Sequence, residues 1–238
     1  MRKGYLVVEG QGEIGAAQNL VQRLWDDLHL APLPWATPKR GKALNTQAGV
    51  LQACELLRSE RDCAAALLLR DEDDECPARR GPEAAYWVAS AALSFPVAVV
   101  LAHREFEAWF LPCLDRMAGK EIRPGLRFAE GAVYKGDPEA KRDVKGLLSK
   151  WFPPGKAYKP TLDQLGMTRM VDFPTLRASK MPSFGTLENA LRFLASPPAG
   201  SLVYPPPKPI EIAEDKSFAG RSNKPSSAGR SKKVTKRK

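Results

Sequence analysis

The sequence has few of the residues on which several functional classes depend. Its 238 residues include four cysteines and two histidines. The cysteines show no C-x-x-C spacing, which disfavours a zinc or disulfide scaffold and predicts reduced thiols in a cytoplasmic protein. No apolar run approaches the roughly 20 residues of a transmembrane helix. The apolar stretch before Glu9 is too short for a signal peptide, so we expect no membrane association.

A phosphate-binding G-x-x-x-x-G-K-[ST] motif is also absent, so any ATP hydrolysis would have to come from another chain. A uniformly basic surface is missing too. The segment 208–238 has ten Lys and Arg against three acids, which accounts for +7 of the net charge of +10. Residues 1–207 therefore carry only about +3, and the basic pI is weak evidence for a nucleic-acid groove.

What the sequence does contain is an alternation of short apolar runs with helical periodicity. Strands are predicted at 5–8, 64–69 and 95–101, and helices at about 14–28, 46–58, 82–93, 105–117 and 183–194. A further helix start is predicted at Asp137-Pro138, leading toward Leu147. This alternation predicts an α/β fold with a mostly parallel, Rossmann-like sheet flanked by helices.

We expect three segments in this chain. Residues 1–118 are predicted to form the α/β core, and residues 119–196 a mainly helical extension that packs on it. Residues 197–238 are rich in Pro, Ser and Lys and are predicted to be a disordered basic tail.

Acidic residues follow each of the three predicted strands. Parallel strands end at the same edge of a sheet, so acids that lie almost a hundred residues apart in the sequence should converge there. Asp71 and Asp73 come from the acidic run 71–75 and share a side if the chain stays extended. Carboxylates in such a group suit Mg²⁺, which takes oxygen ligands. The acids concerned are Glu9, Glu13, Asp71, Asp73, Glu105 and Glu107.

These residues resemble the Toprim domain of topoisomerases, bacterial primases and OLD-family nucleases. The features are Glu9 at an apolar-apolar-Glu-Gly strand end, the Asp-x-Asp at 71–73 and a downstream Glu. Val-Glu-Gly-x-x-Glu at 8–13 and Glu-x-Glu-Ala-Trp-Phe-Leu at 105–111 are similar to a bacterial Toprim-like family of unassigned function. Genes of that family often lie beside an AAA or ABC-type ATPase in phage-defence loci. The resemblance covers about residues 3–115 and continues more weakly to about 195, through Tyr158-Lys159 among others.

The resemblance implies a nuclease that uses Mg²⁺ or Mn²⁺ to cleave DNA or RNA, with DNA the substrate we expect first, and with an ATPase as a partner. Glu9 matches the Toprim general acid/base or metal ligand, and Asp71 and Asp73 match the metal-binding pair. Glu13 and Glu107 match further acids of the nuclease branch, and Glu105 is a further candidate ligand. Arg70 departs from the pattern, because an apolar residue usually precedes the Asp-x-Asp.

Two other functions stay open. In the first, the acidic edge no longer catalyses and the chain is an interaction module that regulates, or is regulated by, an ATPase. In the second, Gly10-Gln11-Gly12-Glu13-Ile14-Gly15 is a dinucleotide-binding turn, although Glu9 and Glu13 would repel a pyrophosphate. Lys145, Lys159 and Lys180 are the candidate nucleic-acid contacts, since an acidic metal site lacks positive groups of its own.

Overall fold

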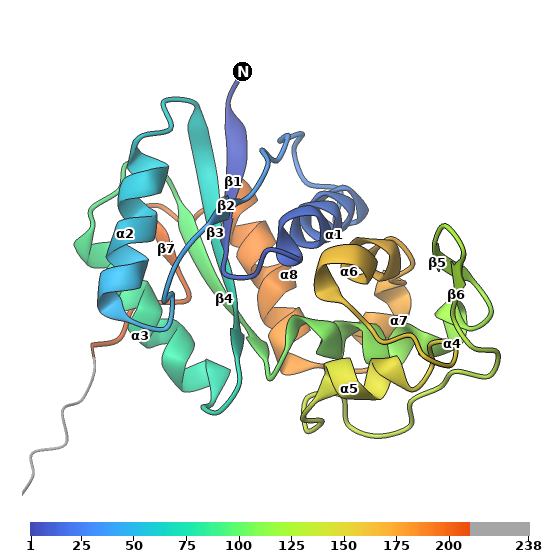
Figure 1. Ribbon diagram of the computed structural model, residues 1–238. Helices are drawn as coiled ribbons and strands as arrows, with labels where there is room; N and C mark the ends of the chain where they lie inside the picture. Colours follow the sequence, from blue (N-terminus) through green and yellow to red (C-terminus); the bar gives the residue numbers. More distant parts are fainter. Residues whose placement is uncertain (210–238) are drawn as a thin grey trace, which may run out of the picture.

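A five-stranded parallel sheet forms the centre of the protein. The computed structural model describes residues 1–209 and orders the strands β2-β1-β3-β4-β7 (Figure 1). Their bounds are β1 Lys3–Val8, β2 Lys39–Arg40, β3 Cys63–Glu72, β4 Val97–His103 and β7 Val203–Tyr204. Neighbouring strands pair in parallel throughout this sheet. The predicted α/β class is therefore confirmed.

Helices cover both faces of the sheet (Figure 1). Helices α1 (Glu13–Asp27) and α8 (Pro182–Ala195) lie on one face, and α2 (Gln47–Arg58) and α3 (Pro77–Ser90) on the other. Side chains alternate between faces along a strand, so Leu67 and Leu69 pack toward α1 while Ala66 and Leu68 pack toward α2 and α3. The continuous apolar run at 64–69 reflects burial on both sides.

Strand β3 is longer than the apolar run predicts. It continues through Arg70, Asp71 and Glu72, which pair in register with the last three residues of β4. Arg70 and Glu72 point to the same face and form an ion pair at 2.7 Å, with both side chains buried. Because this pair satisfies the two charges, the strand can stay in the sheet. Asp71 is thus inside the strand, and the predicted end at residue 69 is wrong.

The segment after β4 is a 3-10 helix, η1 (Phe106–Cys113), followed by the short α4 (Leu114–Met117). The sequence predicts an amphipathic helix over 105–117, and the segment is helical from 106 to 117, but its larger part is a 3-10 helix that is buried on nearly all sides. Pro112 lacks the amide hydrogen that an α-helix needs at this point. Seven of the eight residues of η1 are buried, because the C-terminal part of the chain packs over the face that would otherwise be exposed.

That C-terminal part contains a small antiparallel pair of strands and several short helices. The elements are β5 Glu121–Arg123, β6 Leu126–Arg127, α5 Val144–Ser149, α6 Pro160–Thr168 and α7 Phe173–Ala178. The predicted helix start at Asp137-Pro138 is wrong. Helix α5 begins after Asp143, whose side chain caps it by accepting from the Gly146 N–H. These elements share one hydrophobic core with α1 and α8, while the boundaries at 118 and 196 remain predictions.

Residues 197–209 depart from the expected tail. Val203 and Tyr204 form β7 and pair with Val97 and Ala98 at the start of β4. Two apolar β-formers are enough to extend the sheet, and Pro205 then stops the strand because it has no N–H to donate. The rest of the predicted tail, 210–238, lies outside the described residues. Across residues 1–209, no helix is both long and apolar enough to cross a membrane.

Candidate metal centre

The ends of β1, β3 and β4 bring acidic residues to one edge of the sheet. Asp71 projects from β3 on the side of Leu69, toward η1, and its Oδ1 accepts from the Phe106 N–H at 2.7 Å. Arg104 has a φ of +70°, and this turn reverses the chain after β4. Glu105 and Glu107 then face back toward Asp71. We call Glu13, Asp71, Glu105 and Glu107 the carboxylate cluster.

Lys145 lies inside the carboxylate cluster. Its Nζ is 2.9 Å from Glu105 Oε2, 3.3 Å from Glu107 Oε2 and 3.8 Å from Asp71 Oδ2. Helix α5 is held against the cluster by its own backbone, since the Val144 N–H donates to Glu105 Oε1 at 2.9 Å. The sequence predicts Lys145 as a nucleic-acid contact, and the structure places it as the counter-ion of three acids.

Glu107 is the most deeply buried acid of the cluster, with 1% of its surface exposed. Its Oε1 accepts from the Tyr158 hydroxyl at 2.9 Å and from Gln164 Nε2 at 3.2 Å. Tyr158 and Gln164 are therefore site residues that the sequence analysis does not predict. The Tyr158-Lys159 pair is part of the weaker resemblance, but the tyrosine, and not the lysine, reaches the acids.

Burial of so many carboxylates with one ammonium leaves excess negative charge, and the pKa values reflect it. Burial raises the pKa of Asp71 well above its usual range, and the charges of Glu107 and Glu13 raise it further. The pKa of Glu107 is also raised, chiefly by burial. Burial likewise raises the pKa of Glu13, with added repulsion from Glu107 and Glu9. For Lys145, burial lowers the pKa, but Glu107, Glu105 and Asp71 more than offset this, so the pKa is raised.

Glu9 and Asp73 lie beside the cluster. Together with Asp71 and Asn45 they line a small open hollow at the end of the sheet. Glu9 Oε1 accepts from the Leu44 N–H at 2.6 Å, which turns one oxygen toward the loop before α2. Asp73 is exposed. The structure thus brings Glu9, Asp71 and Asp73 of the predicted catalytic set to one hollow.

The donor chemistry of this edge suits a hard divalent cation, since carboxylate oxygens are the ligands that Mg²⁺ and Mn²⁺ prefer. Oε2 of Glu105 and Oε2 of Glu107 are buried, and the Lys145 ammonium is their partner within residues 1–209. Within residues 1–209, however, no three His, Cys, Asp or Glu side chains form a ready-made ion-binding group. The Lys145 ammonium occupies the place between Asp71, Glu105 and Glu107. The residues fit a cation by type and charge, and binding requires that this ammonium move.

The glycine-rich turn before α1 is occupied by the protein's own groups. The Gly10 N–H donates to Glu13 Oε2 at 3.3 Å, so a carboxylate already lies at the start of the helix. A Cβ on Gly12 would meet Pro160 at 2.7 Å, which shows how closely α6 approaches this turn. A pyrophosphate at this turn would need the Gly10 N–H, which already donates to Glu13, and the space next to Gly12 that α6 fills.

The other two predicted lysines lie outside the carboxylate cluster. Lys159 is exposed, and its backbone N–H donates to Asp163 Oδ2. Lys180 is exposed and lines a separate hollow with His103 and Arg104. Neither side chain is an ion-pair partner of the cluster.

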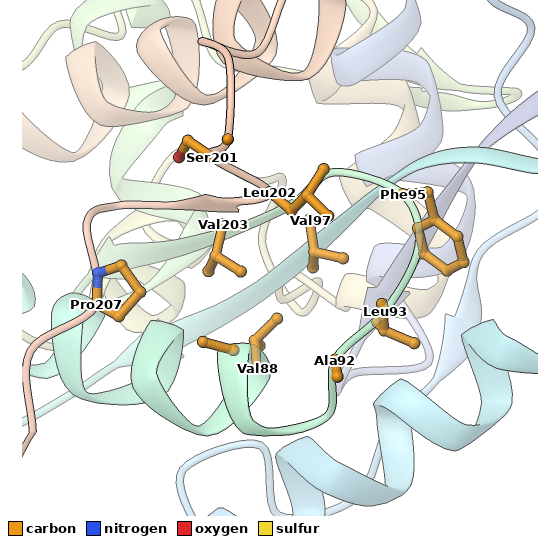
Figure 2. A pocket seen from close by; sticks show the side chains of 11 residues that line it. Val88, Ala92, Leu93, Phe95, Val97, Ser201, Leu202, Val203 and Pro207 are labelled. Carbon is orange, nitrogen blue, oxygen red and sulfur yellow. The ribbon is translucent and has the colours of Figure 1, made fainter.

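An apolar hollow at the opposite end of the sheet has no catalytic chemistry. Figure 2 shows it between the last turn of α3, the start of β4 and the segment around β7, with Val88, Val97 and Val203 facing one another. No titratable side chain lines it. The acidic edge is therefore the part of residues 1–209 on which a chemical function can be argued most directly.

A family model described as a domain of unknown function (DUF4276) matches residues 8–192. The chain belongs to this family. The DUF4276 match begins one residue before Glu9 and ends within α8, so it includes every residue of the carboxylate cluster together with Lys145. No curated protein matches the chain. Membership of the DUF4276 family indicates no function by itself.

Proposed function

We propose that this DUF4276 protein is a divalent-cation-dependent nuclease that hydrolyses phosphodiester bonds in DNA. The observation that supports this most is the carboxylate cluster, in which one ammonium contacts three of four acids at the edge of a parallel sheet. The Toprim resemblance adds the order of the acids along the chain. Bound Mg²⁺ or Mn²⁺ would supply Lewis-acid stabilisation of the developing phosphate charge and a water of lowered pKa.

The chain's own residues have separable roles in this proposal. Asp71 and Glu107 provide the anionic oxygens that hold the cation, and Tyr158 and Gln164 keep Glu107 in its orientation. Glu9 lines the open hollow, where a substrate can reach it, and serves as the group that moves a proton. Lys145, once displaced from the acids, is close enough to neutralise the substrate phosphate.

A nuclease assay tests this proposal. Purified protein should nick plasmid DNA with Mn²⁺ or Mg²⁺ and lose that activity in EDTA. Asp71→Asn and Glu9→Gln should each reduce the rate by at least about 100-fold, the usual scale for removing a group that acts in the transition state. Glu75→Gln is the matched control, because Glu75 belongs to the same acidic run but lines no part of the hollow. Equal cutting by Asp71→Asn and the unchanged protein would sink the proposal.

The second candidate is a non-catalytic module that partners an AAA or ABC-type ATPase. Lys145 favours it, because an ammonium that already contacts three acids offsets part of their charge and leaves less need for a metal. This candidate predicts that Lys145 is a permanent counter-ion and that Mg²⁺ and Mn²⁺ show no saturable binding. An antiviral defence role follows from either candidate only through the resemblance.

A further inference from the structure

A second cavity lies at the outer edge of β4, separate from the carboxylate cluster. Its volume is about 430 Å³, which is within the range of about 300–1,000 Å³ typical of small-molecule sites. The walls come from the start of α3, the second half of β4, the start of α8 and the residues after β7. The apolar residues among them include Pro77, Ala78, Pro82, Val99, Leu101 and Pro205.

The wall formed by β4 offers main-chain hydrogen-bonding groups. The β4–β7 ladder ends at Ala98 and Tyr204, and Pro205 to Pro207 have no N–H with which to extend it. The Val97 N–H donates to the Leu202 carbonyl, so Val97 directs its main-chain groups toward the β7 side of β4. Every second residue of a strand faces the same side, so the N–H and C=O of Leu101 also point toward the β7 side. Leu101 lines the cavity. A neighbouring donor and acceptor therefore face a space with apolar walls.

The mouth of the cavity has two cationic side chains that take part in no ion pair within residues 1–209. A wider hollow shares His103, Glu139 and Pro182 with the cavity and adds Arg104 and Lys180. Among residues 1–209, neither Arg104 nor Lys180 has an acidic side chain within ion-pair distance. The Arg104 guanidinium donates only to the Asp73 carbonyl, and its Nε is buried without a partner. These two side chains are therefore available to an anion.

The acids at this mouth are engaged within the protein. Glu139 Oε1 accepts from the Ser183 N–H at 2.8 Å, and its Oε2 is 3.5 Å from His103 Nδ1. Asp137 Oδ1 accepts from the Glu139 N–H at 2.9 Å. Both carboxylates keep their charge, but these contacts orient them elsewhere, and neither lies within ion-pair distance of Arg104 or Lys180.

We propose that this cavity binds a nucleoside monophosphate. The base lies between the apolar walls with its polar edge at the main chain of Leu101, and the phosphate contacts Arg104 and Lys180. Apolar walls, a donor next to an acceptor, and two cationic side chains without ion-pair partners match the base and the phosphate of a nucleotide. The nucleotide is either free or one unit of a single strand. The proposal goes beyond the proposed function, since no residue of the carboxylate cluster lines this cavity.

Calorimetric titration in EDTA tests the site without any cleavage chemistry. AMP, GMP, CMP and UMP serve as probes, with adenosine and inorganic phosphate as partial ligands. At least one nucleotide should bind with one site per chain, and more tightly than either partial ligand. Lys180→Gln should weaken the binding of that nucleotide about tenfold, which is the effect of losing one charge-assisted contact. It should leave the affinity for adenosine unchanged. Lys156→Gln, at another exposed lysine, is its control.

A filled cavity provides the second variant. Ala78 is exposed and lines this cavity, and Ala89 is exposed on the same helix but lines the apolar hollow of Figure 2. Ala78→Trp should abolish nucleotide binding and Ala89→Trp should preserve it, with both variants melting near the unchanged protein. If a short single-stranded oligonucleotide competes for the cavity, the ligand is one unit of a strand. If it does not compete, the ligand is a free nucleotide. Failure of all four nucleotides to bind at millimolar concentration, or equal binding by the two tryptophan variants, would overturn the proposal.

Discussion

Replacing Lys145 by Met should destabilise the protein in a pH-dependent way. The substitution keeps an unbranched apolar stem but removes the ammonium that contacts Asp71, Glu105 and Glu107. Loss of one partner from a fully buried pair costs about 3–5 kcal/mol. The Lys145 side chain is 40% exposed, and water screens such a charge, so we expect a loss of about 2–3 kcal/mol in the free energy of unfolding at pH 8.

The sign of the pH dependence follows from the raised carboxyl pKa values. The folded protein holds protons on Asp71 and Glu107 at pH values where the unfolded chain has lost them. The free energy of unfolding therefore falls as the pH rises above the ordinary carboxyl pKa values, 3.8 for Asp71 and 4.5 for Glu107. It continues to fall until the pH passes the higher pKa values of the folded protein. Lys145 lowers both pKa values, so its removal should raise them and make this fall steeper.

Urea unfolding at pH 5 and pH 8 measures the effect. The difference between Lys145→Met and the unchanged protein should be larger at pH 8 than at pH 5. Lys150→Met is the control, because Lys150 is an exposed lysine at the end of the same helix. Equal stability of Lys145→Met and the unchanged protein at both pH values would refute the view that Lys145 neutralises the cluster.

Three further results are expected. In the native protein only the exposed Cys76 should react readily with a thiol reagent. Cys54, Cys63 and Cys113 are buried, which raises their pKa values to about 11, 12 and 11, and they should react only after denaturation. Arg70→Met should lower the free energy of unfolding by about 3–5 kcal/mol because Glu72 is left buried and unpaired, and the double variant with Glu72→Met should recover much of it, as urea unfolding would show. Tyr158→Phe should cost about 1–2 kcal/mol by the same assay, because Glu107 loses a buried donor; a variant as stable as the unchanged protein would contradict the contact.

The α/β class could be predicted because local patterns determine it. The runs at 5–8, 64–69 and 95–101 are apolar on both faces, and the helices between them have one apolar face, so periodicity alone indicates buried parallel strands. Helix α8 was predicted within one residue at each end for the same reason. The order of the strands then brings Asp71 and Glu105 together, since the ends of adjacent parallel strands share an edge.

What could not be predicted depends on contacts between distant segments. The extension of β3 depends on the ion pair between Arg70 and Glu72. In the sequence, Glu72 belongs to an acidic run that resembles a loop. The 3-10 helix after β4 is buried by segments far along the chain, which no local pattern reports. Lys145 reaches the acids because α5 docks through Val144 on Glu105, a contact between residues 39 positions apart. Tyr158 and Gln164 enter the site in the same way.

Titration of the protein with Mn²⁺ decides whether the carboxylate cluster is a metal site. If the carboxylate cluster is a metal site, calorimetry should show saturable binding that is lost in Asp71→Asn and retained in Glu75→Gln. Lys145→Met should bind the ion more tightly, since the cation no longer has to displace an ammonium. Absence of saturable binding at millimolar Mn²⁺, in both the unchanged protein and Lys145→Met, would contradict the account and leave the acids as a lysine-neutralised structural cluster.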